Sequence, residues 1–211
     1  MDANLDADKQ STKSRSWLKR TKILSNEWVS TALFIGGVAI VYFFIQGFLI
    51  RTYLVDGQSM ETTLQNGDRL IIDKVPRSLA RVTGHAYIPH RGDIVIFNQS
   101  GLSFGSNAEK QLIKRVVGLP GERVVVKNGS VSVYSKTRAG GYEPDKIGLY
   151  HIDTSFTPGN VDITLRVDEI FVFGDNRTNS EDSRYFGPVK ADKIIGKLSL
   201  RVLPLSKAQR F

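Results

Sequence analysis

An uncharged apolar stretch near the N-terminus places the strongest constraint on how this chain can fold. No residue from Trp28 to Ile50 is charged, and most are aliphatic or aromatic. The stretch is longer than the ~20 apolar residues that a helix needs to cross a membrane. The alternatives are a buried core helix and a cleavable secretory signal, but a signal has an apolar region of only ~7–15 residues and ends in a small-x-small site. Residues 50–53 form no such site, so the sequence predicts a transmembrane anchor helix at 28–50.

Basic residues before the anchor predict its orientation. Residues 1–27 contain Lys9, Lys13, Arg15, Lys19, Arg20 and Lys22. Short basic arms of this kind stay in the cytoplasm, so we expect residues 1–27 to form a short cytoplasmic arm. Residues 51–211 would then be the extracytoplasmic domain of a single-pass plasma-membrane protein. The absence of cysteine is compatible with an oxidising compartment.

Charge and composition limit the partners and cofactors of this domain. The chain carries a formal net charge of +8, but its basic residues are scattered and separated by acidic ones. That pattern disfavours nucleic acid as a partner and favours attraction to the anionic headgroups of a lipid bilayer. Because there is no cysteine and no His-Glu-x-x-His pattern, we predict no metal and no other cofactor.

Residues 51–211 alternate short apolar runs with turn-forming residues, as is typical of a mainly β domain. Short apolar runs bounded by Gly, Pro, Asn and Asp are typical of strands, and they lie at 70–75, 94–97, 112–117, 124–126, 131–134, 161–167, 170–173 and 194–202. Asn128-Gly129 between two of these runs predicts a β-hairpin. No convincing helical pattern follows Ile50, and residues 136–160 are expected to form a surface excursion. The prediction is one N-terminal transmembrane helix followed by an antiparallel β-sheet domain.

A serine activated by a lysine is the catalytic scheme that the residues of this domain support best. The three histidines lie in turn-rich segments typical of surface residues, and there is no Gly-x-Ser-x-Gly elbow. A lysine acts as a base only when neutral, so burial must lower its pKa. Lys114 is the best candidate because it lies within the apolar run 112–117. An ordinary strand lysine whose amine reaches solvent would show the same pattern.

Ser59 is the matching candidate nucleophile. It follows Val55-Asp56-Gly57-Gln58 on an expected turn shortly after the anchor. Gly57 would let a substrate carbonyl approach the backbone closely. A plain turn after a first strand would look the same, so these residues alone leave the role of Ser59 open.

Four ordered segments carry a family resemblance. They are Ser59–Leu64, Arg91–Phe97, Lys114–Glu122 and Gly174–Arg184, and the last matches Gly-Asp-Asn-Arg-x-x-Ser-x-Asp-Ser-Arg at every fixed position. Together with the anchor, they resemble the bacterial type I signal peptidases (leader peptidases), which are membrane-bound serine proteases with a Ser/Lys dyad. Thr62 departs from the proline that is usual in this family. Gly57 stands where some members have a hydroxyl residue.

The resemblance implies a membrane-anchored serine endopeptidase that cleaves N-terminal signal peptides from exported precursor proteins. Ser59 would be the nucleophile and Lys114 the general base, with an oxyanion hole of backbone N–H groups near Gly57 and Ser59. An alternative is a Ser/Lys protease of the same fold that processes one dedicated precursor. A second alternative is a non-catalytic, membrane-tethered β interaction domain.

The resemblance also assigns supporting roles to residues of the second half of the chain. Ser180 would hydrogen-bond the amine of the catalytic lysine. Asp175 would pair with Arg115, and Asp182 with Arg184, so that two ion pairs hold the loop around the site. None of these residues would react with the substrate.

An extended signal peptide is expected to lie beside exposed strand edges, which the resemblance identifies as Tyr53–Gly57 and Gln111–Ile113. The small residues that precede a signal-peptide cleavage site need only shallow apolar pockets. We expect these pockets to be lined by Val55, Met60, Leu64, Leu112 and Ile113, although Met60 and Leu64 could be core residues only. Leu102–Phe104 is expected to touch the outer leaflet. Exported preproteins would be the substrates, with the translocation machinery transiently nearby.

Overall fold

The computed structural model describes residues 27–100, 109–152 and 156–211. The basic arm up to residue 26 and the loop segment Leu102–Phe104 lie outside the described residues. The chain divides into two units, Met1–Gly47 and Phe48–Phe211.

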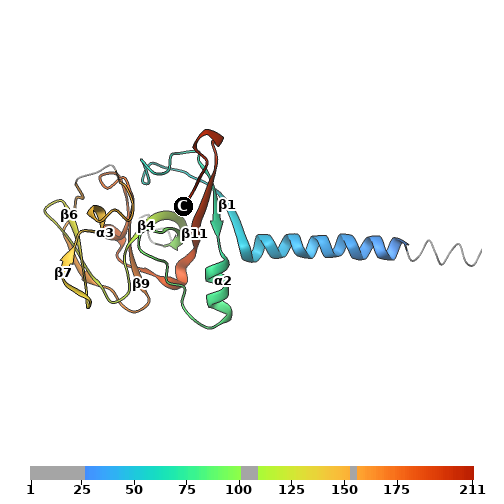
Figure 1. The fold of residues 1–211 in the computed structure, drawn as a ribbon, viewed down its shortest axis with the longest axis horizontal. Coiled ribbons are helices and arrows are strands. Elements are labelled where there is room, and N and C mark those ends of the chain that lie inside the picture. The colour runs from blue at the N-terminus through green and yellow to red at the C-terminus, as the bar shows by residue number, and fades with distance from the viewer. Residues whose placement is uncertain (1–26, 101–108, 153–155) are drawn as a thin grey trace, which may run out of the picture. The chain divides into compact units, whose positions relative to one another are not determined.

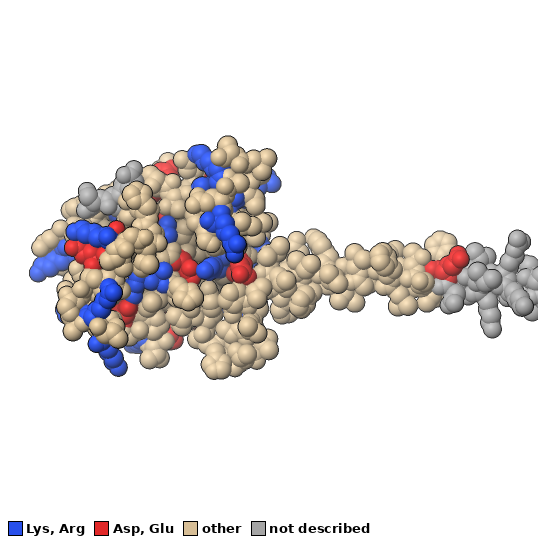
Figure 2. All heavy atoms as spheres, viewed as in Figure 1, with Lys and Arg blue, Asp and Glu red and all other residues tan. Residues whose placement is uncertain are grey.

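The first unit is dominated by an apolar helix. The helix runs from Glu27 to Leu49 with a mean hydropathy of 2.1, and none of its most apolar window is buried against other parts of the protein. Its last turn, Ile45–Leu49, is the π-helical segment η1. Figure 2 shows no lysine or arginine on the visible face of this helix. In the described part of the chain it is the one helix long and apolar enough to cross a membrane.

The second unit is built from two antiparallel sheets (Figure 1). The larger sheet has the order β1-β2-β11-β3-β4-β9-β10, with β12 paired to β11. Its strands are β1 (Ile50–Leu54), β2 (Arg69–Asp73), β3 (Ile94–Gln99), β4 (Lys110–Gly118), β9 (Glu169–Phe173), β10 (Val189–Lys190), β11 (Ile194–Leu203) and β12 (Gln209–Arg210). The smaller sheet has the order β7-β6-β5-β8. Its strands are β5 (Arg123–Lys127), β6 (Ser130–Ser135), β7 (Arg138–Tyr142) and β8 (Val161–Thr164). The mainly β, antiparallel fold class is therefore confirmed.

Turn chemistry and side-chain alternation explain why the strands pair in this way. Asn128 and Gly129 connect β5 to β6 with φ values of 52° and 80°, the left-handed conformation that a two-residue hairpin needs. Strand β9 buries both of its faces, which accounts for the unbroken apolar run in the sequence. Ile170 and Val172 join one core cluster, whereas Phe171 and Phe173 join another.

A third core cluster lies beneath the loop between β1 and β2. Its buried members come from that loop and from strands β2, β3 and β11: Val55, Met60, Leu64, Leu70, Ile72, Ile94, Ile96, Ile195 and Leu198. Apolar side chains thus fix both ends of the loop that carries Ser59.

Two parts of the domain differ from the sequence-based expectation. Val75–Val82, where no convincing helical pattern was found in the sequence, forms the helix α2 with Pro76 in its first turn. Two helical turns without a buried side chain give too little periodicity to be detected in the sequence. Residues 136–160, expected to be a surface excursion, include β7 and the 3₁₀ turn η2 (Pro144–Lys146). The apolar pattern of β7 is weak because its residues are Arg-Ala-Gly-Gly-Tyr. The remaining short helices are α3 (Ser183–Phe186), η3 (Ala191–Lys193) and η4 (Leu205–Lys207).

Candidate active site

The loop between β1 and β2 presents Ser59 from a rigid backbone. The Val55 N–H donates to the Asp68 carbonyl at 2.9 Å, and the Gly67 N–H donates to the Val55 carbonyl at 2.9 Å. The Gly57 N–H donates to Asn66 Oδ1 at 3.0 Å. Gly57 has a φ of 111°, which side chains other than glycine's rarely allow. The loop therefore closes on itself and holds Ser59 at its tip.

Lys114 lies on strand β4, and its side chain contacts Ser59. Its Nζ lies 2.5 Å from Ser59 Oγ, and the residue is 3% exposed. Burial lowers the pKa of Lys114 to about 8, although the negative charges of Asp182, Glu181 and Asp175 act in the opposite direction. The amine is thus held against the hydroxyl in surroundings that favour its neutral form.

Arg115, the next residue of β4, points to the opposite face and ties three segments together. Its Nε donates to Asp175 Oδ1 at 2.8 Å and its Nη2 to Asp175 Oδ2 at 2.6 Å. Its guanidinium carbon lies 4.7 Å from the centre of the Tyr150 ring. The Thr63 hydroxyl, on the Ser59 loop, donates to the same Asp175 carboxylate at 2.5 Å. The Asp175–Arg115 ion pair expected from the sequence is present, and Thr63 is an additional member.

The Gly174–Arg184 segment also holds the backbone on either side of Ser59. The Asn176 N–H donates to the Ser59 carbonyl at 3.1 Å, and Asn176 Nδ2 donates to the Gln58 carbonyl at 3.2 Å. A Cβ at Gly174 would lie 2.3 Å from the Ser59 carbonyl oxygen. Only glycine permits this approach. Asn66, Asn176 and Gly174 were not assigned as site residues from sequence, because their roles depend on backbone contacts between distant segments.

Two buried arginines brace the same segment. Arg184 Nε and Nη2 each lie 2.8 Å from an oxygen of Asp182, and Asp182 Oδ2 also accepts the Gly174 N–H at 3.0 Å. The expected Asp182–Arg184 pair is therefore present. Arg177 pairs with Asp145 and donates to the Gly174 carbonyl at 3.1 Å. Asp145 belongs to η2, so the segment that was expected to be a surface excursion supports the site.

Ser180 does not make the contact expected from the sequence. Its buried Oγ has no hydrogen-bond partner among the described residues, and the Lys114 amine bonds Ser59 instead. The Ser180 hydroxyl packs closely over Gly174, where a Cβ would lie only 2.2 Å away. The expected Ser180–Lys114 hydrogen bond is thus corrected to a packing contact beside the dyad.

A cleft of about 500 Å³ opens at the dyad. Both Ser59 and Lys114 line it, together with three of the five residues expected to bind substrate, Val55, Leu112 and Ile113. The other two, Met60 and Leu64, are 1% and 0% exposed and lie in the core cluster under the loop. Neither of them is among the residues that line the cleft. Leu70 and Ile96, which were not predicted, contribute further apolar lining.

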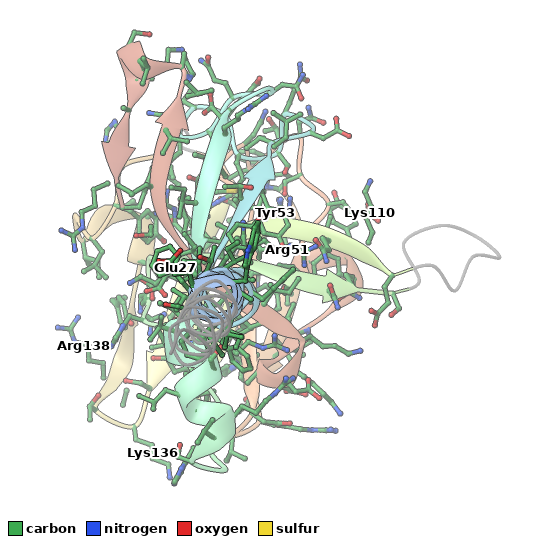
Figure 3. All side chains as sticks on the ribbon, turned by 90° about the vertical axis from the view of Figure 1, so that its right-hand side faces the viewer. Glu27, Arg51, Tyr53, Lys110, Lys136 and Arg138 are labelled. Carbon is green, nitrogen blue, oxygen red and sulfur yellow. The ribbon has the colours of Figure 1, made fainter. Side chains whose placement is uncertain are left out.

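Two open strand edges flank this cleft. Strand β1 pairs only with β2, and residues 110–114 of β4 pair only with β3, in the described part of the chain. Tyr53 of β1 and Lys110 of β4 both line the cleft and are labelled in Figure 3. Unpaired backbone groups on both sides of a cleft can receive an extended peptide as an added strand.

Comparison with known proteins gives consistent matches. The family model described as "Signal peptidase, peptidase S26" matches residues 25–203. A probable signal peptidase I-2 from Synechocystis is 32% identical over 182 residues, covering 86% of this chain and 76% of the relative. A signal peptidase I from Bacillus caldolyticus is 35% identical over 165 residues, covering 76% of this chain and 83% of the relative. A crystal structure of a signal peptidase I from Enterococcus faecalis is 27% identical, covers 53% of this chain and 97% of its own, and has a TM-score of 0.37.

The Asp182→Asn variant is expected to lower the free energy of unfolding by about 3–5 kcal/mol, because Arg184 stays buried without a counter-charge. Chemical denaturation of the full chain in detergent measures the change. Asp162→Asn is the matched control, since its pair with Arg123 is solvent-exposed and screened. An equal effect of the two substitutions would show that the buried pair contributes nothing particular to the fold.

Proposed function

Because the chain belongs to the signal peptidase family, peptidase S26, we propose that Ser59 and Lys114 are the residues with which it cleaves signal peptides. The activity itself follows from the family and from relatives at 28–35% identity that are named signal peptidase I or a variant of that name. The assignment of residues rests mainly on one observation, the 2.5 Å contact between Ser59 Oγ and a buried Lys114 amine.

Lys114 acts as the general base for acylation. With a pKa of about 8, about a tenth of the amine is neutral at pH 7, whereas an ordinary lysine is almost wholly protonated. The neutral amine takes the proton from Ser59 Oγ as that oxygen attacks the scissile carbonyl. The Ser59 proton therefore moves directly along the hydrogen bond that joins the pair.

The backbone N–H of Ser59 supplies the oxyanion hole. In the described residues it donates no hydrogen bond, whereas the Gly57 N–H is already used by Asn66. An N–H of this kind is worth ~3–4 kcal/mol of transition-state stabilisation when it is held in place. The hydrogen bond from Asn176 to the Ser59 carbonyl fixes the orientation of the adjoining peptide.

Lys114 then changes from base to acid. As the tetrahedral intermediate collapses, its ammonium gives the proton to the departing amine nitrogen, and the acyl group remains as an ester on Ser59. Water replaces the departed chain, and the neutral Lys114 removes a proton from it as it attacks the ester. Collapse of the second intermediate releases the signal peptide and returns the proton to Ser59.

The substrate binds as an extended strand between the edges of β1 and β4. Its backbone pairs with unpaired groups of both strands, and its small side chains enter the shallow apolar lining formed by Val55, Leu112 and Ile113. This is the geometry that small-x-small cleavage sites need. Exported preproteins are therefore the substrate class, met near the translocation machinery.

The apolar helix anchors this chemistry at a membrane. We assign residues 1–27 to the cytoplasm, 28–50 to the plasma membrane and 51–211 to the extracytoplasmic side, because the basic residues precede the helix. Signal peptides emerge on the same extracytoplasmic side during export.

Ser59→Ala and Lys114→Met are each expected to abolish cleavage of a preprotein with an Ala-x-Ala site by the full chain in detergent. The first removes the nucleophile and the second the base, whose loss costs about 10²-fold or more in rate. Ser206→Ala and Lys127→Met, both at exposed positions, are the matched controls and should keep wild-type rates. Cleavage by either dyad variant would refute the mechanism. Efficient cleavage of only one preprotein out of a varied panel would instead favour a dedicated protease.

The rate of cleavage is expected to depend on pH through Lys114. Only the neutral amine is a base, so kcat/KM should rise with pH and level off above the pKa of about 8. Initial rates measured from about pH 6 to about pH 10 would show this profile. A profile that still rises through about pH 10, where an ordinary lysine titrates, would contradict a buried base of lowered pKa.

A further inference from the structure

Helix α2 presents apolar side chains to solvent rather than to the core of the domain. None of its residues is buried. Val75, Leu79 and Val82 are 44%, 62% and 81% exposed, and their spacing of four and three residues places them on one face. A helix in a water-soluble domain normally turns such a face inward. In α2 the face is left uncovered by the described parts of the protein.

The other side of α2 is cationic, and Arg77 Nη2 on that side reaches the Asp192 carbonyl at 3.5 Å. Lys74 precedes the helix, Arg77 and Arg81 lie within it, and α2 itself contains no acidic residue. Burial lowers the pKa of Lys74, and the positive charges of Arg51 and Arg77 lower it further. Apolar residues on one side of a helix and cations on the other are the features of helices that lie in the interface of an anionic membrane.

Hydrogen bonds hold α2 next to the end of the apolar helix. The Lys74 N–H donates to the Leu49 carbonyl at 2.8 Å, and the Ser78 hydroxyl donates to the Phe48 carbonyl at 3.0 Å. Phe48 and Leu49 are the last residues of the segment that is long enough to span a membrane. The first turn of α2 is therefore fixed to the point where the chain leaves that span, and the helix is only ~12 Å long.

We propose that α2 is an interfacial helix whose Val75, Leu79 and Val82 face enters the headgroup region of an anionic bilayer, while the cations on its other side add long-range attraction to the anionic headgroups. The inference rests on the membrane anchor assigned above. It adds a second membrane contact to that of the anchor. A second copy of the chain fits less well, since a two-fold contact between α2 helices would bring the same cations together.

The test uses cysteine labelling, for which the chain is suited because it has no cysteine of its own. The full chain carrying Leu79→Cys is labelled with an environment-sensitive fluorophore and reconstituted in vesicles of phosphatidylcholine with or without phosphatidylglycerol. Spin-labelled lipids in the headgroup region should quench the label more strongly when phosphatidylglycerol is present. Val167→Cys is the control, because Val167 is 86% exposed in the turn between β8 and β9 and should not be quenched.

Charge variants test the electrostatic part. Arg77→Gln with Arg81→Gln should lower the membrane-bound fraction of the label, by about fivefold in equilibrium constant for each cation removed. Lys127→Gln with Lys136→Gln removes the same charge from the β5–β6 and β6–β7 region, which Figure 1 shows away from α2, and should change nothing.

Three outcomes would each overturn the proposal. They are equal quenching at positions 79 and 167, quenching that does not depend on phosphatidylglycerol, and disulfide-linked dimers of the unlabelled Leu79→Cys variant. The experiment measures quenching rather than peptidase activity, so its result does not depend on the roles proposed for Ser59 and Lys114.

Discussion

The burial of Lys114 beside Ser59 is the constraint on which the rest of the structure depends. A lysine amine in water is protonated and useless as a base, whereas in this site burial lowers its pKa from 10.5 to about 8. The shift corresponds to about 3 kcal/mol of unfavourable interaction with the charged form, which the remainder of the fold has to offset. Acidic groups nearby, Asp182, Glu181 and Asp175, oppose the shift. The pKa is therefore a balance, and in the proposed mechanism it would let the amine act as a base near neutral pH and as an acid after it has taken the proton.

Ion pairs that make no contact with Ser59 or Lys114 hold the segments around these two residues in place. Arg115 and Asp175 join β4 to the Gly174–Arg184 segment, and Thr63 brings the Ser59 loop to the same carboxylate. Buried ion pairs of this kind add little net stability, because desolvation offsets most of their attraction. Their contribution is positional. Asp182 accepts the Gly174 N–H and Arg177 donates to the Gly174 carbonyl, so both sides of the glycine that packs on Ser59 are fixed.

Features that depend on residues close together in the sequence could be predicted, whereas features that depend on contacts between distant residues could not. The uncharged run predicted the apolar helix, Asn128-Gly129 predicted the β5–β6 hairpin, and the four ordered segments led to the family. Val55, Leu112 and Ile113 line the cleft as expected, whereas Met60 and Leu64 lie in the core cluster under the loop, and apolar residues near the serine look the same in the sequence at either position. The Ser180 contact was wrong because the hydroxyl packs over Gly174 instead, and the direction of one side chain does not follow from the order of residues. Helix α2 was not predicted because it is only two turns long and none of its side chains is buried in a core.

A site-specific titration of the Lys114 amine tests the central claim most directly. Nuclear magnetic resonance of the full chain with ¹⁵N-labelled lysine side chains, compared with Lys114→Met to assign the signal, gives the pKa without reference to catalysis. A buried base next to Ser59 should titrate with a midpoint of about 8. A midpoint at the ordinary lysine value of about 10.5 would contradict this mechanism, because Lys114 would then be charged at neutral pH and could not take the proton from Ser59.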